Sequence, residues 1–413
     1  MNKIIDPFSY KGRVCINSSK SYFQRALALS CLTQSNCLIL GSPNEEDIKI
    51  AIDICRHIGM GLNISDNAVK ITGSLSPKSN TIHFNSGESG LCTRMFGVIL
   101  SSFYEKTIIQ GKGTVLSRKI DFSCLKQLGV QVKSTGFNFP VILDGRLSSG
   151  IIDFDCSNGS QLLTGLLMVL PFLKGNSILN VTGLVSRPYI DMTIDILKNF
   201  GIKVMNNDYK KFIIPGNQKS IVSKYEIEGD WSGAAFHLVG AAISGVVDVY
   251  GLNIKSLQAD KAIVDALELC GADITIDNDF IRVKKKDLNS FSFNATHCPD
   301  LFPPLVVLAA SCKGTSIIDG VNRLTNKESN RSLTLQKEFE KIGVHITLDG
   351  NRMLIEGTDN VSGGEVESHN DHRIAMALSI MACVASSSIT IKDANAVAKS
   401  YSNFYIDLEK VGS

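Results

Sequence analysis

The sequence lacks three features: an excess of charge of one sign, a long hydrophobic run and any Cys-x-x-Cys spacing. Its 413 residues include 42 lysines and arginines against 40 aspartates and glutamates, which gives a net charge of +2. A chain so nearly neutral has no general attraction to nucleic acid or to a membrane surface. A site for an anion must therefore be built locally from a few cations.

The hydrophobic segments and the cysteines narrow the class of protein further. Apolar runs such as 166–173, which contains Pro171, are too short to span a bilayer. The first ten residues include Asp6 and Pro7 and lack the apolar core of a signal peptide. The 11 cysteines lie mostly within apolar segments, which is typical of reduced core residues. We therefore expect a soluble, cytoplasmic protein.

One short pattern returns six times along the chain. Each copy is the end of an apolar-faced helix, then a glycine, then alternating apolar and polar residues. The glycines are Gly59, Gly129, Gly201, Gly271, Gly343 and Gly412, at steps of 70, 72, 70, 72 and 69 residues. A glycine after the last helical turn is typical of a left-handed C-cap, and the alternation predicts a half-buried strand. The spacing predicts six units of about 70 residues, each mixing helices and strands.

Units of this size are close to the minimum for an independent core, so they should share cores in groups. Six units would form either a ring or two domains of three. The segments 162–170, 238–243 and 305–310 are apolar on nearly every side, which predicts central, buried helices. Short strands are expected between helices, for example at 82–84, 247–250 and 388–391. The predicted fold class is α/β (α+β).

Three turns combine small residues with a nearby cation. Residues 17–21 precede a predicted helix with Arg25, residues 86–90 precede one with Arg94, and residues 157–161 precede the apolar helix 162–170. Helix N-termini of this kind bind phosphate and carboxylate. The alternative is that their serines and asparagines are ordinary N-caps. Their recurrence at equivalent points of the repeat favours a common anionic ligand.

The segment 326–331 contains two cations and a carboxylate. On a helix, the spacing would place Lys327 and Arg331 on one face with Glu328 beside them. The alternative is a solvated first turn. Asp300 is the second prominent carboxylate, and its alternative role is to cap the following helix, although Pro303 lacks an N–H that such a cap would often bond. The candidate anion-binding cations of the whole chain are Lys20, Arg25, Arg94, Arg118, Arg187, Lys327, Arg331, Arg373 and Lys399. Many cations with two acids suit a substrate that carries several phosphate or carboxylate groups and undergoes a proton transfer.

These residues carry a resemblance to the EPSP synthase (3-phosphoshikimate 1-carboxyvinyltransferase) family of enolpyruvyl transferases, over essentially the full length. The most specific matches are Lys327-Glu328-Ser329 with Arg331, and Asn370-Asp371-His372-Arg373. The other matches are Ser19-Lys20-Ser21 with Arg25, Gly90 with Arg94, Ser117-Arg118, Ser160-Gln161, 185–191, Pro299-Asp300 and Lys399.

The resemblance implies two domains, each of three repeated βαβαββ units like an inside-out α/β barrel, with the active site in the interdomain cleft. It places residues 1–18 and 229–413 in one domain and 19–228 in the other. The implied reaction transfers the carboxyvinyl group of phosphoenolpyruvate to the 5-hydroxyl of shikimate 3-phosphate through a tetrahedral ketal. Its products are 5-enolpyruvylshikimate 3-phosphate and phosphate, in the shikimate pathway to chorismate and the aromatic amino acids. The resemblance implies no cofactor, metal, nucleic acid or membrane partner, and a monomer.

The roles of individual residues are also implied by the resemblance. Asp300 would take the hydroxyl proton, Glu328 would handle the proton at C3, and Lys20 would bridge the hydroxyl and the departing phosphate. The residues implied to bind phosphoenolpyruvate are Lys20, Gly90, Arg94, Arg118, Gln161, Arg331, Arg373 and Lys399. Those implied to bind shikimate 3-phosphate are Ser21, Arg25, Ser160, Gln161, Ser186, Tyr189, Asp300 and Lys327.

The chain departs from the family pattern at several points. Glu88-Ser89-Gly90-Leu91 stands where the family usually has Asn-Ala-Gly-Thr, Asn17-Ser18 replaces Pro-Gly, and Arg323 stands where Asn is frequent. An acid beside an anion site is unfavourable unless it turns towards an arginine, so we expect weaker or altered binding of the inhibitor glyphosate.

Two alternatives stay open. The sister transferase that acts on UDP-N-acetylglucosamine carries a catalytic cysteine on a glycine-rich loop, whereas 111–118 here contains none. A non-catalytic protein that binds phosphorylated metabolites is the other alternative, although simple binding gains nothing from buried acids. His369 and His372 lack further metal ligands at suitable spacing, so His372 is expected to be structural or to face the substrate.

Overall fold

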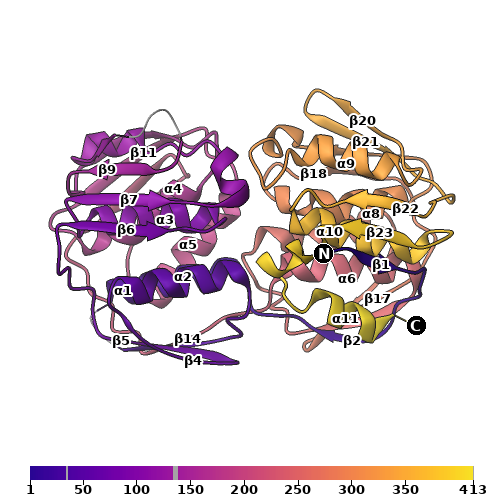
Figure 1. The fold of residues 1–413 in the computed structure, drawn as a ribbon, viewed down its shortest axis with the longest axis horizontal. Coiled ribbons are helices and arrows are strands. Elements are labelled where there is room, and N and C mark those ends of the chain that lie inside the picture. The colour runs from indigo at the N-terminus through magenta and orange to yellow at the C-terminus, as the bar shows by residue number, and fades with distance from the viewer. Residues whose placement is uncertain (34–35, 134–137, 413) are drawn as a thin grey trace. The chain divides into compact units, whose positions relative to one another are not determined.

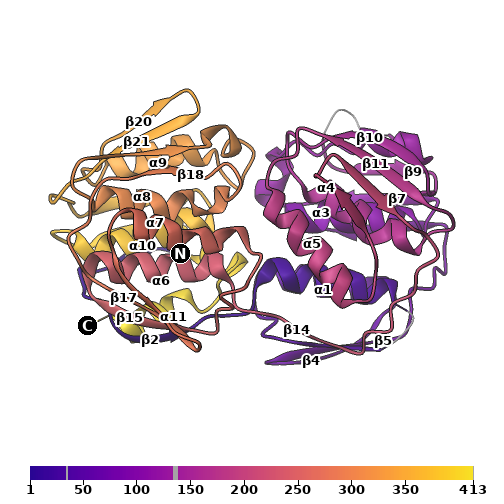
Figure 2. The same cartoon turned by 180° about the vertical axis from the view of Figure 1, so that it is seen from behind.

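The computed structural model describes residues 1–33, 36–133 and 138–412. The chain divides into two compact units, one made of Met1–Asn17 with Glu228–Ser413 and the other of Ser18–Ile227. In each unit three helices lie inside the ring of sheets (Figures 1 and 2). These inner helices are α1, α3 and α4 in the unit Ser18–Ile227, and α6, α8 and α10 in the other unit.

The unit Ser18–Ile227 contains three four-stranded sheets with the same strand order. In each sheet the first two strands are parallel and the remaining pairs are antiparallel. The sheets are β14 (Lys224–Glu226), β3 (Cys37–Leu40), β5 (Ala68–Thr72) and β4 (Gly61–Ser65); β6 (Thr81–Asn85), β7 (Lys106–Gln110), β9 (Val141–Asp144) and β8 (Gln131–Val132); and β10 (Ile151–Asp155), β11 (Ser177–Thr182), β13 (Lys211–Ile214) and β12 (Met205–Asn207).

The inner helices of this unit are α1 (Lys20–Leu32), α3 (Gly90–Ser101) and α4 (Gln161–Val169). All three are buried along almost their whole length. For α3 and α4 the reason is that they are apolar on nearly every side, whereas α1 also buries the polar side chains of Gln24 and Arg25. The other helical segments are α2 (Glu46–His57), α5 (Arg187–Asn199) and the 3₁₀ turns η1 (Gly113–Ser117), η2 (Ser123–Leu128) and η3 (Leu170–Phe172). Side chains from all three sheets and the inner helices form one continuous core, which confirms the expectation of a shared core.

The second unit repeats this arrangement with two four-stranded sheets and one three-stranded sheet. The sheets are β2 (Lys11–Cys15), β15 (Val246–Tyr250), β17 (Phe280–Lys284) and β16 (Asp273–Ile276); β18 (Ser292–Asn294), β19 (Thr315–Asp319), β21 (Arg352–Glu356) and β20 (Ile346–Asp349); and β22 (Gly364–Glu367), β23 (Ile389–Lys392) and β1 (Lys3–Ile5). The helical segments are α6 (Trp231–Ser244), η4 (Ala259–Ala262), α7 (Ile263–Leu269), η5 (Pro299–Leu301), α8 (Phe302–Ala310), η6 (Val321–Arg323), α9 (Arg331–Glu340), α10 (His372–Met381), η7 (Ala382–Val384), η8 (Ala394–Lys399) and α11 (Phe404–Val411). The predicted central helices at 238–243 and 305–310 lie in α6 and α8, both fully buried.

The βαβαββ repeat is confirmed, with an exchange of strands that the sequence pattern does not predict. In chain order β2 precedes α1, yet it pairs with β15; β14 precedes α6, yet it pairs with β3. The first and fourth copies therefore exchange their first strands. The sixth copy takes its last strand, β1, from the beginning of the chain, where it pairs antiparallel with β23.

Five of the six repeat glycines end a helix in the left-handed region. The φ angles are 91° at Gly59, 92° at Gly129, 77° at Gly201, 81° at Gly271 and 85° at Gly343, and a side chain is strained there. The prediction is wrong for Gly412, whose φ is −81°. That residue forms an isolated antiparallel bridge with Tyr10 instead of turning back into a hairpin of its own copy.

Within these described ranges, no helix is long and apolar enough to cross a membrane.

Candidate functional site

The first group of predicted residues in the unit Ser18–Ile227 is an arginine cluster, which we define as Gly90, Arg94, Arg118 and Gln161. It lies where α3 and α4 begin. Arg94 Nη1 donates to Gln161 Oε1 at 2.9 Å and to the Gly90 carbonyl at 3.2 Å. A β-carbon at Gly90 would lie 3.0 Å from Arg118 Nη1 and 3.1 Å from Arg94 Nη1. The glycine therefore lets two guanidinium groups approach the start of α3.

Like charges meet in the arginine cluster. Burial, and then the positive charge of Arg118, lower the pKa of Arg94 to about 10. The guanidinium of Arg94 is still charged near neutral pH; its side chain is partly buried, and Arg118 is buried. Two such cations at a helix N-terminus are suited to an anion, which would relieve their mutual repulsion.

A second group surrounds Arg25, which is buried in α1. Its Nη1 donates to the Ser21 carbonyl at 2.8 Å and its Nη2 to the Tyr189 carbonyl at 3.3 Å, while Nε donates to Thr193 Oγ1 at 3.0 Å. Burial lowers the pKa of Arg25 to about 10. Arg25 thus brings Ser21 and Tyr189, two predicted site residues far apart in the sequence, into one place. Ser186 lies beside them as the N-cap of α5, with a left-handed φ of 58°.

The N-termini of α1 and α3 are also joined. Gln24 Nε2 donates to Ser89 Oγ at 3.0 Å and to the Asp47 carbonyl at 3.0 Å. Lys20 Nζ lies 3.0 Å from Asp47 Oδ2, a carboxylate to which the sequence analysis assigned no role. Ser89 accepts a hydrogen bond from Cys92 N at 3.3 Å, so the N-cap interpretation is right for this serine. Ser19 and Ser160, the N-caps of α1 and α4, make no such side-chain cap bond.

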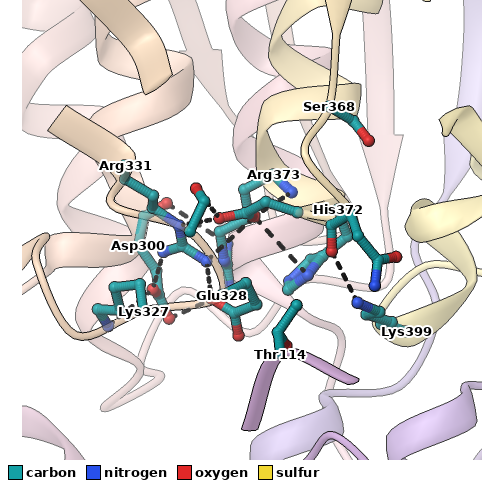
Figure 3. A network of polar contacts seen from close by, with 12 residues as sticks. Thr114, Asp300, Lys327, Glu328, Arg331, Ser368, His372, Arg373 and Lys399 are labelled. Atoms are coloured by element: carbon teal, nitrogen blue, oxygen red, sulfur yellow. Dashed lines mark hydrogen bonds and ion pairs between the residues drawn. The ribbon is translucent and has the colours of Figure 1, made fainter. Parts of the chain in front are cut away.

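The other unit contains a carboxylate cluster, which we define as Asp300, Lys327, Glu328, Arg331 and Arg373 (Figure 3). Asp300 Oδ1 lies 3.1 Å from Lys327 Nζ and 2.7 Å from Arg331 Nη1. Its Oδ2 lies 3.2 Å from Arg373 Nη2. Glu328 binds Arg331 Nη2. One guanidinium, that of Arg331, therefore holds both carboxylates that the sequence analysis singled out.

The expected helical face at 326–331 is wrong. Residues 326–330 form a turn, and α9 begins only at Arg331. Lys327 and Arg331 nevertheless meet, because both bind Asp300. Asp300 itself lies in η5, and the N-cap of α8 is Leu301. The alternative interpretation of Asp300 as the cap of that helix is therefore wrong.

The charges around Asp300 set its protonation state. Burial raises the pKa of Asp300, but the positive charges of Arg373, Lys327 and Arg331 outweigh this and hold the pKa well below its usual range. Burial likewise lowers the pKa of Lys327, and the nearby Asp300 raises it in part. Asp300 is therefore ionised throughout the physiological pH range.

Three further aspartates lie around the carboxylate cluster, and the sequence analysis assigned them no role in the site. Asp371 binds Arg331 Nε at 2.8 Å, and Asp230, which caps α6, accepts from Ser232 Oγ at 2.5 Å. Ser232 Oγ in turn accepts from Arg373 Nη2 at 3.2 Å. Asp260 is buried in η4, and burial together with the negative charge of Asp300 raises its pKa to about 7. Asp230 and Asp371 are the N-caps of α6 and α10, and an aspartate directly before an apolar segment is a signal that could have found them.

Lys399 is held by a turn of unusual backbone conformation. Its Nζ donates to the Asn370 carbonyl at 2.7 Å. His369 and Asn370 have φ angles of 52° and 55°, and His369 Nε2 lies 2.9 Å from Glu338 Oε1. His372 begins α10 and is buried. Among the residues that the structure describes, no group of three or more histidine, cysteine, aspartate and glutamate side chains is placed to hold a metal ion.

Comparison with known proteins identifies the family. Residues 6–408 match the family model described as EPSP synthase (3-phosphoshikimate 1-carboxyvinyltransferase). The chain belongs to the EPSP synthase family.

Relatives and solved structures agree with this assignment. The 3-phosphoshikimate 1-carboxyvinyltransferase of Clostridium novyi (strain NT) is 36% identical over 424 residues, covering 99% of this chain and 97% of the relative. That of Clostridium acetobutylicum is 37% identical over 416 residues, covering 99% and 96%. The structure of EPSP synthase from Acinetobacter baumannii matches with a TM-score of 0.82 at 25% identity, covering 100% of this chain and 98% of that one.

Membership of the EPSP synthase family decides between the two enolpyruvyl transferases that the sequence left open. The alternative assignment to the UDP-N-acetylglucosamine branch has no support in these matches, since the family model and the relatives carry the EPSP synthase description. The segment 111–118 contains no cysteine, in agreement with this assignment.

Proposed function

We propose that this chain transfers the carboxyvinyl group of phosphoenolpyruvate to the 5-hydroxyl of shikimate 3-phosphate and releases phosphate. The observation that carries the proposal is the attachment of Asp300 and Glu328 to the same buried guanidinium, that of Arg331. Two acids held at fixed positions beside several cations suit a reaction that moves two protons and develops negative charge on phosphate.

The chemistry needs one proton acceptor and one proton donor. The 5-hydroxyl must lose a proton as it attacks C2 of the enol phosphate, and C3 must gain one. This step forms a tetrahedral ketal, which then loses phosphate as a proton leaves C3. Asp300 is ionised and accepts the hydroxyl proton, and it gives this proton up to the departing phosphate, so that it returns to its starting state. Glu328 delivers the proton to C3 and removes it in the second step.

The cations serve the two anionic substrates. Lys20, Arg94, Arg118, Arg331, Arg373 and Lys399, with Gly90 and Gln161, bind phosphoenolpyruvate, and Lys20 also assists the departing phosphate. Ser21, Arg25, Ser160, Gln161, Ser186, Tyr189, Asp300 and Lys327 bind shikimate 3-phosphate. The burial of Arg118, Arg331 and Arg373 supports these assignments, because ion pairs with a ligand are stronger where water is excluded.

Phosphate release from phosphoenolpyruvate tests the function directly, with shikimate 3-phosphate and UDP-N-acetylglucosamine supplied in parallel. We expect release with shikimate 3-phosphate alone. Asp300→Asn and Glu328→Gln should each lower kcat by about 10²–10⁴-fold, whereas Glu340→Gln, at an exposed position of α9, should not. Full turnover by Asp300→Asn would remove its catalytic assignment. Absence of release with either acceptor would favour a non-catalytic binding protein.

We also propose a cytoplasmic monomer that needs neither metal nor other cofactor. Turnover should therefore survive dialysis against EDTA, and sedimentation should give the mass of one chain. Loss of turnover on chelation, restored by one metal ion, would contradict the first part, and a dimer mass would contradict the second.

A further inference from the structure

Glu88 is the acid that stands where the family usually has asparagine, and the structure shows what it binds. It lies two residues before α3. Its Oε2 accepts one hydrogen bond from the backbone N–H of Thr114 at 3.0 Å and another from the Thr114 hydroxyl at 2.9 Å. Thr114 is the second residue of η1, and Arg118 directly follows that turn. The carboxylate therefore connects the turn before α3 with the turn that carries Arg118.

The backbones of the two turns are joined beside this contact. Lys112 N donates to the Gly87 carbonyl at 2.9 Å, and Ser86 N donates to the Gln110 carbonyl at 2.8 Å. These bonds bring the segments together at residues 110–112. Glu88 extends the connection to Thr114, into η1 itself.

Gly113 makes room for the carboxylate. Its φ is 56°, and a β-carbon there would lie 2.4 Å from Glu88 Cδ. Atoms cannot approach so closely, so any larger residue at this position would displace the carboxylate as well as strain the backbone. Glu88, Gly113 and Thr114 thus fit one another as a set.

The Thr114 hydroxyl, which binds Glu88, also contacts Arg118. Its oxygen accepts a hydrogen bond from Arg118 Nη2 at 3.3 Å. Because its single hydrogen is donated to Glu88, its lone pairs are available to the guanidinium. The turn also fixes the backbone at this point, since Arg118 N donates to the Val115 carbonyl at 3.1 Å. Arg118 Nη1 is one of the groups close to Gly90 in the arginine cluster.

We propose that Glu88 is a positioning residue for phosphoenolpyruvate binding: through Thr114 it holds η1 and directs the Arg118 guanidinium into the arginine cluster. The effect of Glu88 on phosphoenolpyruvate binding rests on the proposed function, in which Arg118 binds that substrate. The effect of Glu88 on the conformation of η1 rests only on the contacts of Glu88, Gly113 and Thr114.

The rival explanation is that Glu88 acts only through its negative charge, by weakening the attraction of the site for anions. The two explanations predict different effects of Glu88→Gln and Glu88→Ala. Glutamine keeps an oxygen that can accept from Thr114 but loses the charge, whereas alanine loses both. Positioning predicts that Glu88→Gln resembles the unchanged protein. A pure charge effect predicts that both variants bind phosphoenolpyruvate more tightly.

The turn is tested by amide hydrogen exchange at Thr114. We expect Glu88→Ala to accelerate exchange of this amide by about tenfold, the size of one lost hydrogen bond, and Glu88→Gln to accelerate it much less. Glu105→Gln is the matched control in the same unit, because the Glu105 carboxylate pairs with Arg146 at an exposed position. Unchanged exchange at Thr114 in Glu88→Ala would overturn the proposal.

The effect on the substrate is tested by steady-state kinetics. We expect Glu88→Ala and Thr114→Val to raise KM for phosphoenolpyruvate by about five- to tenfold, as for one weakened charged hydrogen bond. KM for shikimate 3-phosphate should stay within about twofold, and Thr114→Ser, which keeps the hydroxyl, should restore the original KM. A parallel rise of both KM values would indicate general damage and overturn the role of Glu88 in directing Arg118.

The two tests separate this inference from the proposed function. If the unchanged protein released no phosphate with shikimate 3-phosphate, the proposed function would fail. The dissociation constant of phosphoenolpyruvate, measured by calorimetry for Glu88→Ala, Glu88→Gln and the unchanged protein, would then take the place of KM. Equal affinity of both variants and the unchanged protein would overturn the positioning role, and weaker binding by Glu88→Ala alone would support it.

Discussion

Arg331 and Asp371 form an ion pair in which neither side chain is exposed, with Arg331 Nε 2.8 Å from Asp371 Oδ2. The same carboxylate accepts from Arg373 N at 3.0 Å, which caps α10, and from Ser329 Oγ at 3.1 Å. Burial lowers the pKa of Arg331, but Asp371 and then Glu328 and Asp300 raise it well above its usual value. Asp371 therefore fixes both the guanidinium that holds the two acids and the helix start that carries Arg373.

Asp371→Asn should destabilise this unit strongly. Removing one partner of a buried ion pair leaves the other uncompensated, which costs about 3–5 kcal/mol. Denaturant unfolding measures this change in the free energy of unfolding. Asp287→Asn is the control, since Asp287 pairs with Lys313 in an exposed position and should change nothing measurable. Equal effects of the two substitutions would contradict the role of Asp371.

Asp260 should make stability depend on pH. Burial and the charge of Asp300 raise its pKa to about 7, above the value of about 3.9 in an unfolded chain. The folded protein therefore holds this proton more tightly, and the associated stability is present at low pH and is lost as pH rises towards 7. Asp260→Asn removes this dependence.

Unfolding of Asp260→Asn and the unchanged protein at several pH values checks this expectation. The free energy of unfolding of the variant, relative to the unchanged protein, should rise by about 1.4 kcal/mol per pH unit between pH 4 and 7 and level off above it. A difference that does not vary with pH would show that Asp260 keeps the same protonation state in the folded and unfolded protein.

Glu338 should support the turn that holds Lys399. This buried carboxylate accepts from Lys341 Nζ at 2.5 Å, Glu367 N at 2.8 Å and His369 Nε2 at 2.9 Å. Burial raises the pKa of Glu338, and these hydrogen bonds outweigh burial and lower it. The stability it contributes is therefore present above the ordinary glutamate pKa of about 4.3 and is lost as pH falls below it.

Glu338→Gln should lower the free energy of unfolding by about 1–3 kcal/mol at pH 7, and by less at pH 4. Its KM for phosphoenolpyruvate should rise, because the Asn370 carbonyl that holds Lys399 belongs to the turn bound by Glu338. Denaturation at both pH values and steady-state kinetics measure the two effects, with Glu340→Gln as the exposed control on the same helix. Equal destabilisation at pH 4 and pH 7 would contradict the role of the ionised carboxylate.

Gly90→Ala should separate substrate binding from stability. The new β-carbon would lie 3.0 Å from Arg118 Nη1 and 3.1 Å from Arg94 Nη1, so these side chains must move. Alanine favours a helix over glycine by about 1 kcal/mol, which offsets the crowding in the free energy of unfolding. KM for phosphoenolpyruvate should rise while the denaturation midpoint changes little. An unchanged KM would show that the arginine cluster tolerates the methyl group.

Much of the fold could be predicted because it depends on the order of apolar, polar and glycine residues within short segments of the chain. The left-handed glycines at the ends of the second helices, such as Gly201 and Gly343, reflect a conformational preference of the residue itself. The inner helices α6 and α8 are apolar on every side, so burial is the stable solution for them. The motifs with Lys327-Glu328 and Asn370-Asp371-His372-Arg373 likewise indicated the family without any knowledge of contacts.

Sequence alone thus determined the repeat, the buried helices and the family, because each depends on neighbours in the chain. Tertiary structure alone decided that β2 pairs with β15 and β14 with β3, since strand pairing over long separations depends on which edges are open in the folded unit. It also decided that Lys327 and Arg331 meet on Asp300 from a turn, and that Glu88 binds Thr114. The direction of a charged side chain depends on the partner that compensates its burial, and that partner is set only when distant segments come together.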